Sequence, residues 1–118
     1  MTHKSTSLML YSRNAINQFI PNGNAVYFLR GIADENSLYP IYYIGRSSNG
    51  RFRDLLLEKF YKNEWNDVVY INYIECESDR EAKELQKYEI TRHRPKYNKE
   101  EHSIVNTFIS SPTFKFSL

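Results

Sequence analysis

Cysteine is almost missing from this 118-residue sequence, which contains Cys76 and no second one. A single cysteine excludes a disulfide within the chain and a zinc site built from several cysteines of one chain. Because Cys76 closes a strand-like run, we interpret it as a small apolar residue at a strand end. Such sparing use of cysteine is typical of proteins from a reducing compartment.

Long hydrophobic runs and a strong net charge are absent as well. No apolar stretch approaches the ~20 residues that a membrane-spanning helix needs, and residues 1–7 lack the apolar segment of a secretory signal. We therefore expect no membrane association and a cytoplasmic location. The formal net charge is only +2, so any basic surface that attracts nucleic acid must be local.

Aromatic residues, in contrast, are plentiful, because the chain contains 10 tyrosines and 7 phenylalanines. Tyrosine packs like other aromatics but keeps a hydroxyl, and therefore suits both sheets and nucleic-acid surfaces. With 41% hydrophobic residues, the chain can build the core of one domain. We expect a flexible N-terminal arm over residues 1–11, a domain over residues 12–98 and a tail over residues 99–118. The tail can add an edge strand or contact a partner.

Hydrophobic periodicity divides the predicted domain into helices and strands. A first helix is predicted to begin at the N-cap residue Ser12 and to end at Pro21. A second helix is predicted over residues 50–62. The apolar faces of these two helices are expected to consist of Ala15, Ile16, Phe19 and Ile20, and of Phe52, Leu56 and Phe60. Runs rich in valine, isoleucine and tyrosine predict strands over residues 25–32, 41–45 and 67–75.

The last predicted helix begins with a capping box, which places Ser78 at the N-cap and Glu81 three residues later. Pro95 ends this helix, because proline lacks a backbone donor and disfavours a helical residue before it. Its inward face by spacing consists of Ala82, Leu85, Gln86, Glu89, Ile90 and His93. Two long polar side chains on an apolar face, Gln86 and Glu89, are unusual and indicate a function.

The most specific pattern is the order of short motifs along the chain. One strand carries Ala25-Val26-Tyr27, the next carries Tyr43-Ile44-Gly45, and the helix that follows carries Arg53. After the capped helix comes Pro95-Lys96-Tyr97-Asn98. This order resembles that of the GIY-YIG nuclease family over residues 12–98. The resemblance implies an α+β fold with a small three-stranded antiparallel sheet flanked by helices.

The resemblance also implies a role for each motif residue in the hydrolysis of DNA. Tyr27 and Tyr43 would hold or deprotonate the attacking water, which requires nearby positive charge to lower the pKa of a tyrosine. Arg46 would supply that charge, and Arg53 would bind the scissile phosphate. A glutamate early in the last helix would hold one Mg²⁺ or Mn²⁺ ion, and Asn98 would fix the backbone near the site.

Position 86 departs from the family pattern. Counting back from Pro95 and Asn98 places the metal-binding glutamate at Gln86, whose neutral amide is a poor metal ligand. Three possibilities stay open: the chain is a natural pseudo-nuclease, position 86 was changed from glutamate to trap a complex, or Glu89 has taken over the metal. We therefore expect a metal-dependent DNA endonuclease, in a form that Gln86 can disable. The alternative is a non-cleaving DNA-binding or inhibitory module on the same scaffold.

Basic residues near the predicted site are the candidates for contacts with duplex or branched DNA. They are Arg51 at the start of the second helix, and Arg92, Arg94 and Lys96 at the end of the last one. The same residues can instead form a solvated face or interact with a helix dipole. Trp65 can anchor a loop or stack on a base. A homodimer is also expected, because one small nuclease domain needs a second copy or a second step to cut both strands.

Overall fold

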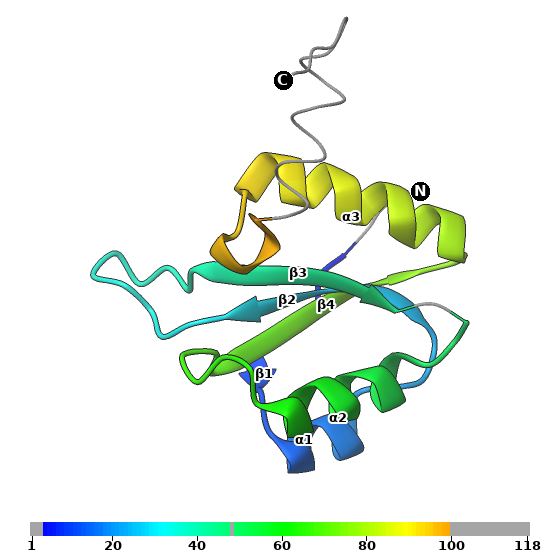
Figure 1. Ribbon diagram of the computed structural model, residues 1–118, viewed down its shortest axis with the longest axis horizontal. Coiled ribbons are helices and arrows are strands. Elements are labelled where there is room, and N and C mark those ends of the chain that lie inside the picture. The colour runs from blue at the N-terminus through cyan, green and yellow to red at the C-terminus, as the bar shows by residue number, and fades with distance from the viewer. Residues whose placement is uncertain (1–3, 48, 100–118) are drawn as a thin grey trace, which may run out of the picture.

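The computed structural model describes residues 4–47 and 49–99. It shows an α+β arrangement in which helices cover both faces of one antiparallel sheet (Figure 1). Helix α3 lies on one face, and helices α1 and α2 lie on the other. The elements in chain order are β1 (Met9–Leu10), α1 (Arg13–Phe19), β2 (Asn24–Arg30), β3 (Ile41–Ser47), α2 (Phe52–Lys62), β4 (Tyr70–Cys76), α3 (Asp79–His93) and the 3-10 helix η1 (Lys96–Asn98).

The sheet has four strands in the order β1-β4-β2-β3, and every neighbouring pair is antiparallel. The prediction of three strands was wrong, because β1 is a two-residue strand that is too short to give a periodic signal. Residues 1–11 were predicted as a flexible arm, but in the described part of this segment β1 and an isolated bridge between Ser5 and Ile74 pair with β4. Residues 100–118 of the predicted tail lie outside the described residues.

The other predicted elements are present, with ends shifted by a few residues. Both predicted serine caps form, because the Ser12 hydroxyl accepts the backbone N–H of Ala15 at 3.2 Å and that of Ser78 accepts the N–H of Glu81 at 3.0 Å. The Glu81 carboxylate reaches back to the backbone N–H of Glu77 at 2.6 Å, one residue before the N-cap. Helix α3 therefore begins with a slightly displaced capping box.

Apolar side chains fill the space on both sides of the sheet, and burying each large one stabilises the fold by ~1.5–3 kcal/mol. The layer under α1 and α2 includes Ile16, Leu29, Phe52, Leu56 and Ile71. The layer under α3 includes Val26, Phe28, Ile44, Ala82 and Ile90.

Two residues of the predicted apolar faces are less buried than expected. Phe19 is 56% exposed, because α1 ends there and the extended Ile20 takes the buried position at the helix end. Phe60 is partly buried at the margin of the core. In the part of the chain that the structure describes, no helix combines the length and the apolar character that crossing a bilayer requires.

Candidate functional site

Strand β3 places the predicted site residues on two different faces of the sheet. Gly45 lies opposite Tyr27 of β2, and the ring of Tyr27 lies across it. Arg46 points to the other face, because side chains alternate along a strand, and it contacts Gln86 of α3. Since β3 is an edge strand, groups from the two faces can meet only around its free edge.

The two motif tyrosines lie together on the face that α2 covers. The ring centroids of Tyr27 and Tyr43 are 6.1 Å apart, and the ring of Tyr27 stacks on Phe52 at 5.7 Å. Burial raises the pKa of Tyr27 well above its ordinary value, and interactions with Tyr43, Tyr11 and Glu64 raise it further. The expectation that positive charge lowers this pKa was therefore wrong, and Tyr27 is a poor base in this structure.

The two arginines at the start of α2 already have partners within the protein. Nε of Arg53 donates to the carbonyl oxygen of Ile20 at 2.9 Å, and its backbone N–H donates to Oδ1 of Asn22 at 2.9 Å. These bonds tie α2 to the end of α1. Arg51 is exposed and pairs with Glu58 at 3.1 Å. A pair between two exposed side chains contributes little to stability, so Arg51 can exchange it for a phosphate.

Gln86 belongs to a hydrogen-bond network around the backbone of Ile44. Its Oε1 accepts from Nη1 of Arg46 at 3.0 Å, and its Nε2 donates to the carbonyl oxygen of Ile44 at 3.3 Å. Asn98, which is fully buried, donates to the same carbonyl at 3.0 Å and accepts the N–H of Ile44 at 2.8 Å. The amide of Asn98 therefore pairs with both outward backbone groups of this edge-strand residue.

This network does not fit a divalent cation at position 86. The amide oxygen of Gln86 already accepts from a guanidinium, whose positive charge would repel a cation at that oxygen. Its Nε2 is a donor and cannot bind a metal.

Glu89, the substitute metal ligand, is buried as predicted, at 7% exposure. Its carboxylate is occupied by Nε2 of His93 at 3.1 Å and by Arg92 at 3.8 Å. Within residues 4–47 and 49–99, no three histidine, cysteine, aspartate or glutamate side chains are grouped as metal ligands. Neither candidate ligand therefore fits the expected Mg²⁺ or Mn²⁺ ion.

Arg46 is incompletely satisfied by its protein partners. Besides Gln86 it has Asp79 at 4.0 Å, and its buried Nε has no hydrogen-bond partner among the described residues. A buried donor without a partner costs about 1–3 kcal/mol. An oxyanion that arrives at the free edge of β3 would therefore be favoured beside Arg46.

Sequence reasoning missed a groove that includes the predicted catalytic Tyr43. Its volume is about 490 Å³, and we call it the aromatic–lysine groove. Its lining comes from β3, the end of α2, the loop before β4, η1 and the residue after η1. It is lined by Tyr43, Lys59, Glu64, Trp65, Lys96, Tyr97 and Lys99. These residues are far apart in the sequence, so no local spacing identifies them as one group, although the sequence had singled out Tyr43, Trp65 and Lys96 one by one.

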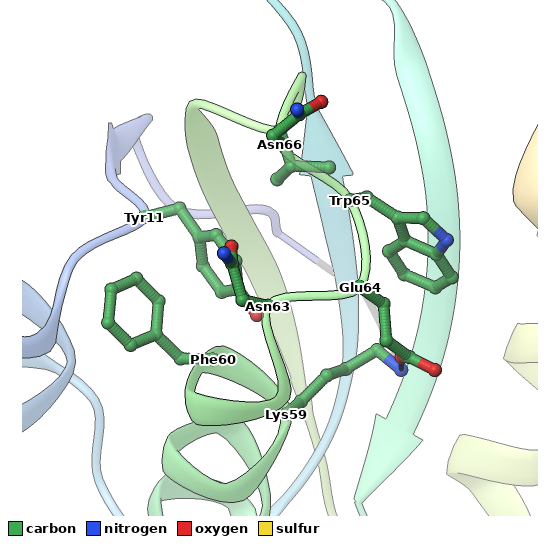
Figure 2. A pocket seen from close by; sticks show the side chains of 8 residues that line it. Tyr11, Lys59, Phe60, Asn63, Glu64, Trp65 and Asn66 are labelled. Carbon is green, nitrogen blue, oxygen red and sulfur yellow. Dashed lines mark hydrogen bonds and ion pairs between the residues drawn. The ribbon is translucent and has the colours of Figure 1, made fainter.

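Stacked aromatic rings form the wall of this groove. Trp65 stacks on Tyr97 with centroids 4.5 Å apart and an angle of 3° between the rings, and Tyr43 is 4.8 Å from Trp65. Nζ of Lys59 lies 4.5 Å and 4.6 Å from the ring centroids of Tyr43 and Trp65. Figure 2 shows the adjoining hollow of about 150 Å³, with the Trp65 ring directed toward β3 and Lys59 beside Glu64. Trp65 thus anchors its loop.

Charged hydrogen bonds hold the η1 side of the groove. Nζ of Lys96 is 2.7 Å from Asp67, and the hydroxyl of Tyr97 donates to the same carboxylate at 2.9 Å. Burial acts to raise the pKa of Asp67, but hydrogen bonds from Lys96 and Tyr97 outweigh it and lower that pKa. The bond to Asp67 raises the pKa of Lys96. Lys96 therefore remains charged at the groove, which Lys59 and Lys99 also line.

The four predicted DNA-contacting cations do not line one common hollow. Lys96 lines the aromatic–lysine groove, whereas Arg92 lines a separate hollow between α3 and the sheet. Arg51 precedes α2, at the end opposite to Lys59 in its last turn. Arg94 caps α3 in a left-handed conformation, with φ of 47°.

Comparisons of the chain with protein-family models, with curated proteins and with solved structures find no match. The resemblance to GIY-YIG nucleases therefore depends on the motif residues alone.

Proposed function

We propose that this chain is a DNA-binding protein on a nuclease-like scaffold, and that with Gln86 it binds DNA without cutting it. The observation that carries the proposal is the aromatic–lysine groove beside Tyr43. Lysines can neutralise phosphates, and aromatic side chains can contact bases or sugars, the combination found at sites for nucleic acid. Three lysines line the groove. Lys59 pairs with Glu64 at 3.4 Å and Lys96 with Asp67 at 2.7 Å, so DNA phosphates would take over these two lysines from carboxylates.

The absence of cleavage follows from the environment of position 86. Both polar atoms of the Gln86 amide form hydrogen bonds within the protein: Oε1 accepts from Arg46, and Nε2 donates to the carbonyl oxygen of Ile44. An ionised glutamate could not donate to that carbonyl. Glutamine is therefore the residue that suits this position, which favours a natural pseudo-nuclease over a glutamate changed to trap a complex and over a metal held by Glu89.

The binding proposal is tested by fluorescence anisotropy with single-stranded, duplex and branched DNA over a range of salt concentrations. The double variant Lys59→Gln/Lys96→Gln should bind more weakly and lower the salt slope by about one for each lost phosphate contact. The matched control is Lys83→Gln/Lys87→Gln, which removes the same charge from exposed positions of α3. Equal weakening by both pairs, or no binding to any DNA, would refute the groove as the DNA site.

Cleavage is tested on supercoiled plasmid and branched DNA with Mg²⁺ or Mn²⁺. We expect no product from the chain as it is, and DNA cutting by the unaltered chain would refute the non-cleaving function. In that case, loss of cleavage in Glu89→Gln would identify Glu89 as the metal ligand.

Sedimentation of the protein alone and with DNA tests the expected homodimer.

The second candidate function is the metal-dependent endonuclease itself. It is favoured by the pairing of Tyr27 with Tyr43, and by the two hydrogen bonds that join Asn98 to Ile44 of the second tripeptide. Cutting by Gln86→Glu alone, with no cutting by the unaltered chain, would identify a disabled nuclease. Failure of both proteins to cut any substrate leaves the binding function.

A further inference from the structure

A second hollow lies on the sheet face that α3 covers, away from the aromatic–lysine groove. Its volume is about 350 Å³, within the ~300–1,000 Å³ typical of small-ligand sites. Phe28, Ile41 and Ile74 give it apolar lining. Its polar groups include the guanidinium of Arg30 and the amide of Asn72. We call it the Arg30 hollow.

Arg30 is held in place by neutral partners. Its Nε donates to Oδ1 of Asn72 at 2.8 Å, and its Nη1 donates to the carbonyl oxygen of Tyr39 at 2.9 Å. The guanidinium carbon also lies 5.7 Å from the ring centroid of Phe28. The ion pairs that join described residues to one another do not include Arg30.

The position of Arg30 is costly for a charge without a counter-ion. Burial lowers the pKa of Arg30, because removal from water disfavours the charged form. Asn72, which accepts the bond from its Nε, is itself 5% exposed in the middle of β4. Charges withdrawn from water are normally paired, so this half-buried guanidinium is an oriented cation that an anion would stabilise.

Glu89 also lines the hollow, where its carboxylate already has two partners within α3. Its carboxylate pairs with His93 at 3.1 Å and with Arg92 at 3.8 Å. The positive charge of Arg92 reduces the repulsion between Glu89 and an incoming anion. The side chain of Arg92 is 58% exposed, so this second guanidinium can reach a ligand without losing much water.

We propose that the Arg30 hollow binds a small organic anion, a carboxylate or a phosphomonoester joined to a compact apolar body. A planar guanidinium matches two oxygens of either group. The apolar body would cover Phe28, Ile41 and Ile74. This site is independent of DNA binding in the aromatic–lysine groove.

The test uses the full chain and three probes with the same aromatic body: benzoate, phenyl phosphate and the neutral benzyl alcohol. Binding is followed by NMR of the Arg30 Nε–H and the Asn72 side-chain amide. At least one anion should shift both signals, and benzyl alcohol should not shift them at the same concentration. A response to benzoate alone identifies a carboxylate ligand, and a response to phenyl phosphate alone identifies a phosphomonoester. Shifts by neither anion would overturn the proposal.

Variants then locate the bound anion. Arg30→Met should weaken binding at least about tenfold, since a hydrogen bond to a charged group is worth roughly 1.5–3 kcal/mol. If Arg30→Met does not fold, Arg92→Met decides, because it should weaken binding severalfold while the exposed Arg80→Met does not. Equal affinity in Arg92→Met and Arg80→Met would then overturn the proposal. Loss of binding in Lys59→Gln/Lys96→Gln would also overturn it, because the anion would then occupy the groove.

Discussion

The ring of Tyr27 lies across Gly45, the residue opposite it on the neighbouring strand. A Cβ atom at position 45 would overlap Cζ and the hydroxyl oxygen of that ring. Tyr27 cannot turn away, because it is 2% exposed and stacked on Phe52. The last residues of the two motif tripeptides are therefore one packing unit, and the tyrosine of the first requires the glycine of the second.

Gly45→Ala should consequently destabilise the fold. We expect a loss of about 1–3 kcal/mol in the free energy of unfolding, the usual cost of overpacking, measured by urea denaturation. Gly23→Ala is the matched control, since no atom lies within 4 Å of the place where its Cβ would be. That control should change stability by less than about 1 kcal/mol. An equal loss of unfolding free energy in both variants would show that the Tyr27 ring is not the reason why position 45 requires glycine.

Alkaline pH should destabilise the protein through Tyr27. Its pKa is raised well above the ordinary value by burial, so the folded state keeps a proton that the unfolded chain releases near pH ~10. The raised pKa therefore contributes its full share to the free energy of unfolding below pH ~10. Above that pH the contribution declines by up to ~1.4 kcal/mol per pH unit. Tyr27→Phe should flatten the decline of the urea midpoint, whereas Tyr61→Phe, at a 63% exposed position, should leave it unchanged. Equal slopes in wild type and Tyr27→Phe would contradict the raised pKa.

Gln86→Glu should lower stability near neutral pH, independently of its effect on DNA. The glutamate loses the hydrogen bond to the Ile44 carbonyl and brings a carboxylate oxygen to that carbonyl, while attraction to Arg46 offsets part of the cost. We expect a net loss of about 1 kcal/mol, measured by urea denaturation. Gln18→Glu makes the same chemical change at an exposed site of α1 and should be neutral. Stabilisation by Gln86→Glu would instead indicate a position adapted to a carboxylate.

Local signals in the sequence were sufficient to predict most of the fold. The caps at Ser12 and Ser78 and the stop at Pro95 each depend on neighbouring residues, and they mark helix ends that the structure contains. β1 was missed because its two residues owe their strand conformation to pairing with β4. No local pattern carries that information.

The candidate site was less predictable, because its geometry comes from tertiary contacts. The stack of Trp65 on Tyr97 joins residues from different segments, so the aromatic–lysine groove has no sequence motif. The alternation of side chains along β3 could have separated Gly45 from Arg46. The sequence also carries a signal at Arg30 and Asn72, since each is a polar residue within a strand that is otherwise rich in apolar side chains.

Asn98 should be among the residues whose removal costs most stability. Its side chain replaces a neighbouring strand at the free edge of β3, because it accepts from the N–H of Ile44 and donates to its carbonyl. In Asn98→Ala the N–H loses its buried partner, whereas the carbonyl keeps Gln86. Together with the cost of the cavity left by the missing side chain, we expect the free energy of unfolding measured by urea denaturation to fall by about 2–4 kcal/mol. Hydrogen exchange at the amide of Ile44 should become faster. The matched variant Asn66→Ala, in the exposed loop before β4, should change neither quantity. Unchanged exchange at Ile44 in Asn98→Ala would mean that Asn98 does not hold this strand edge.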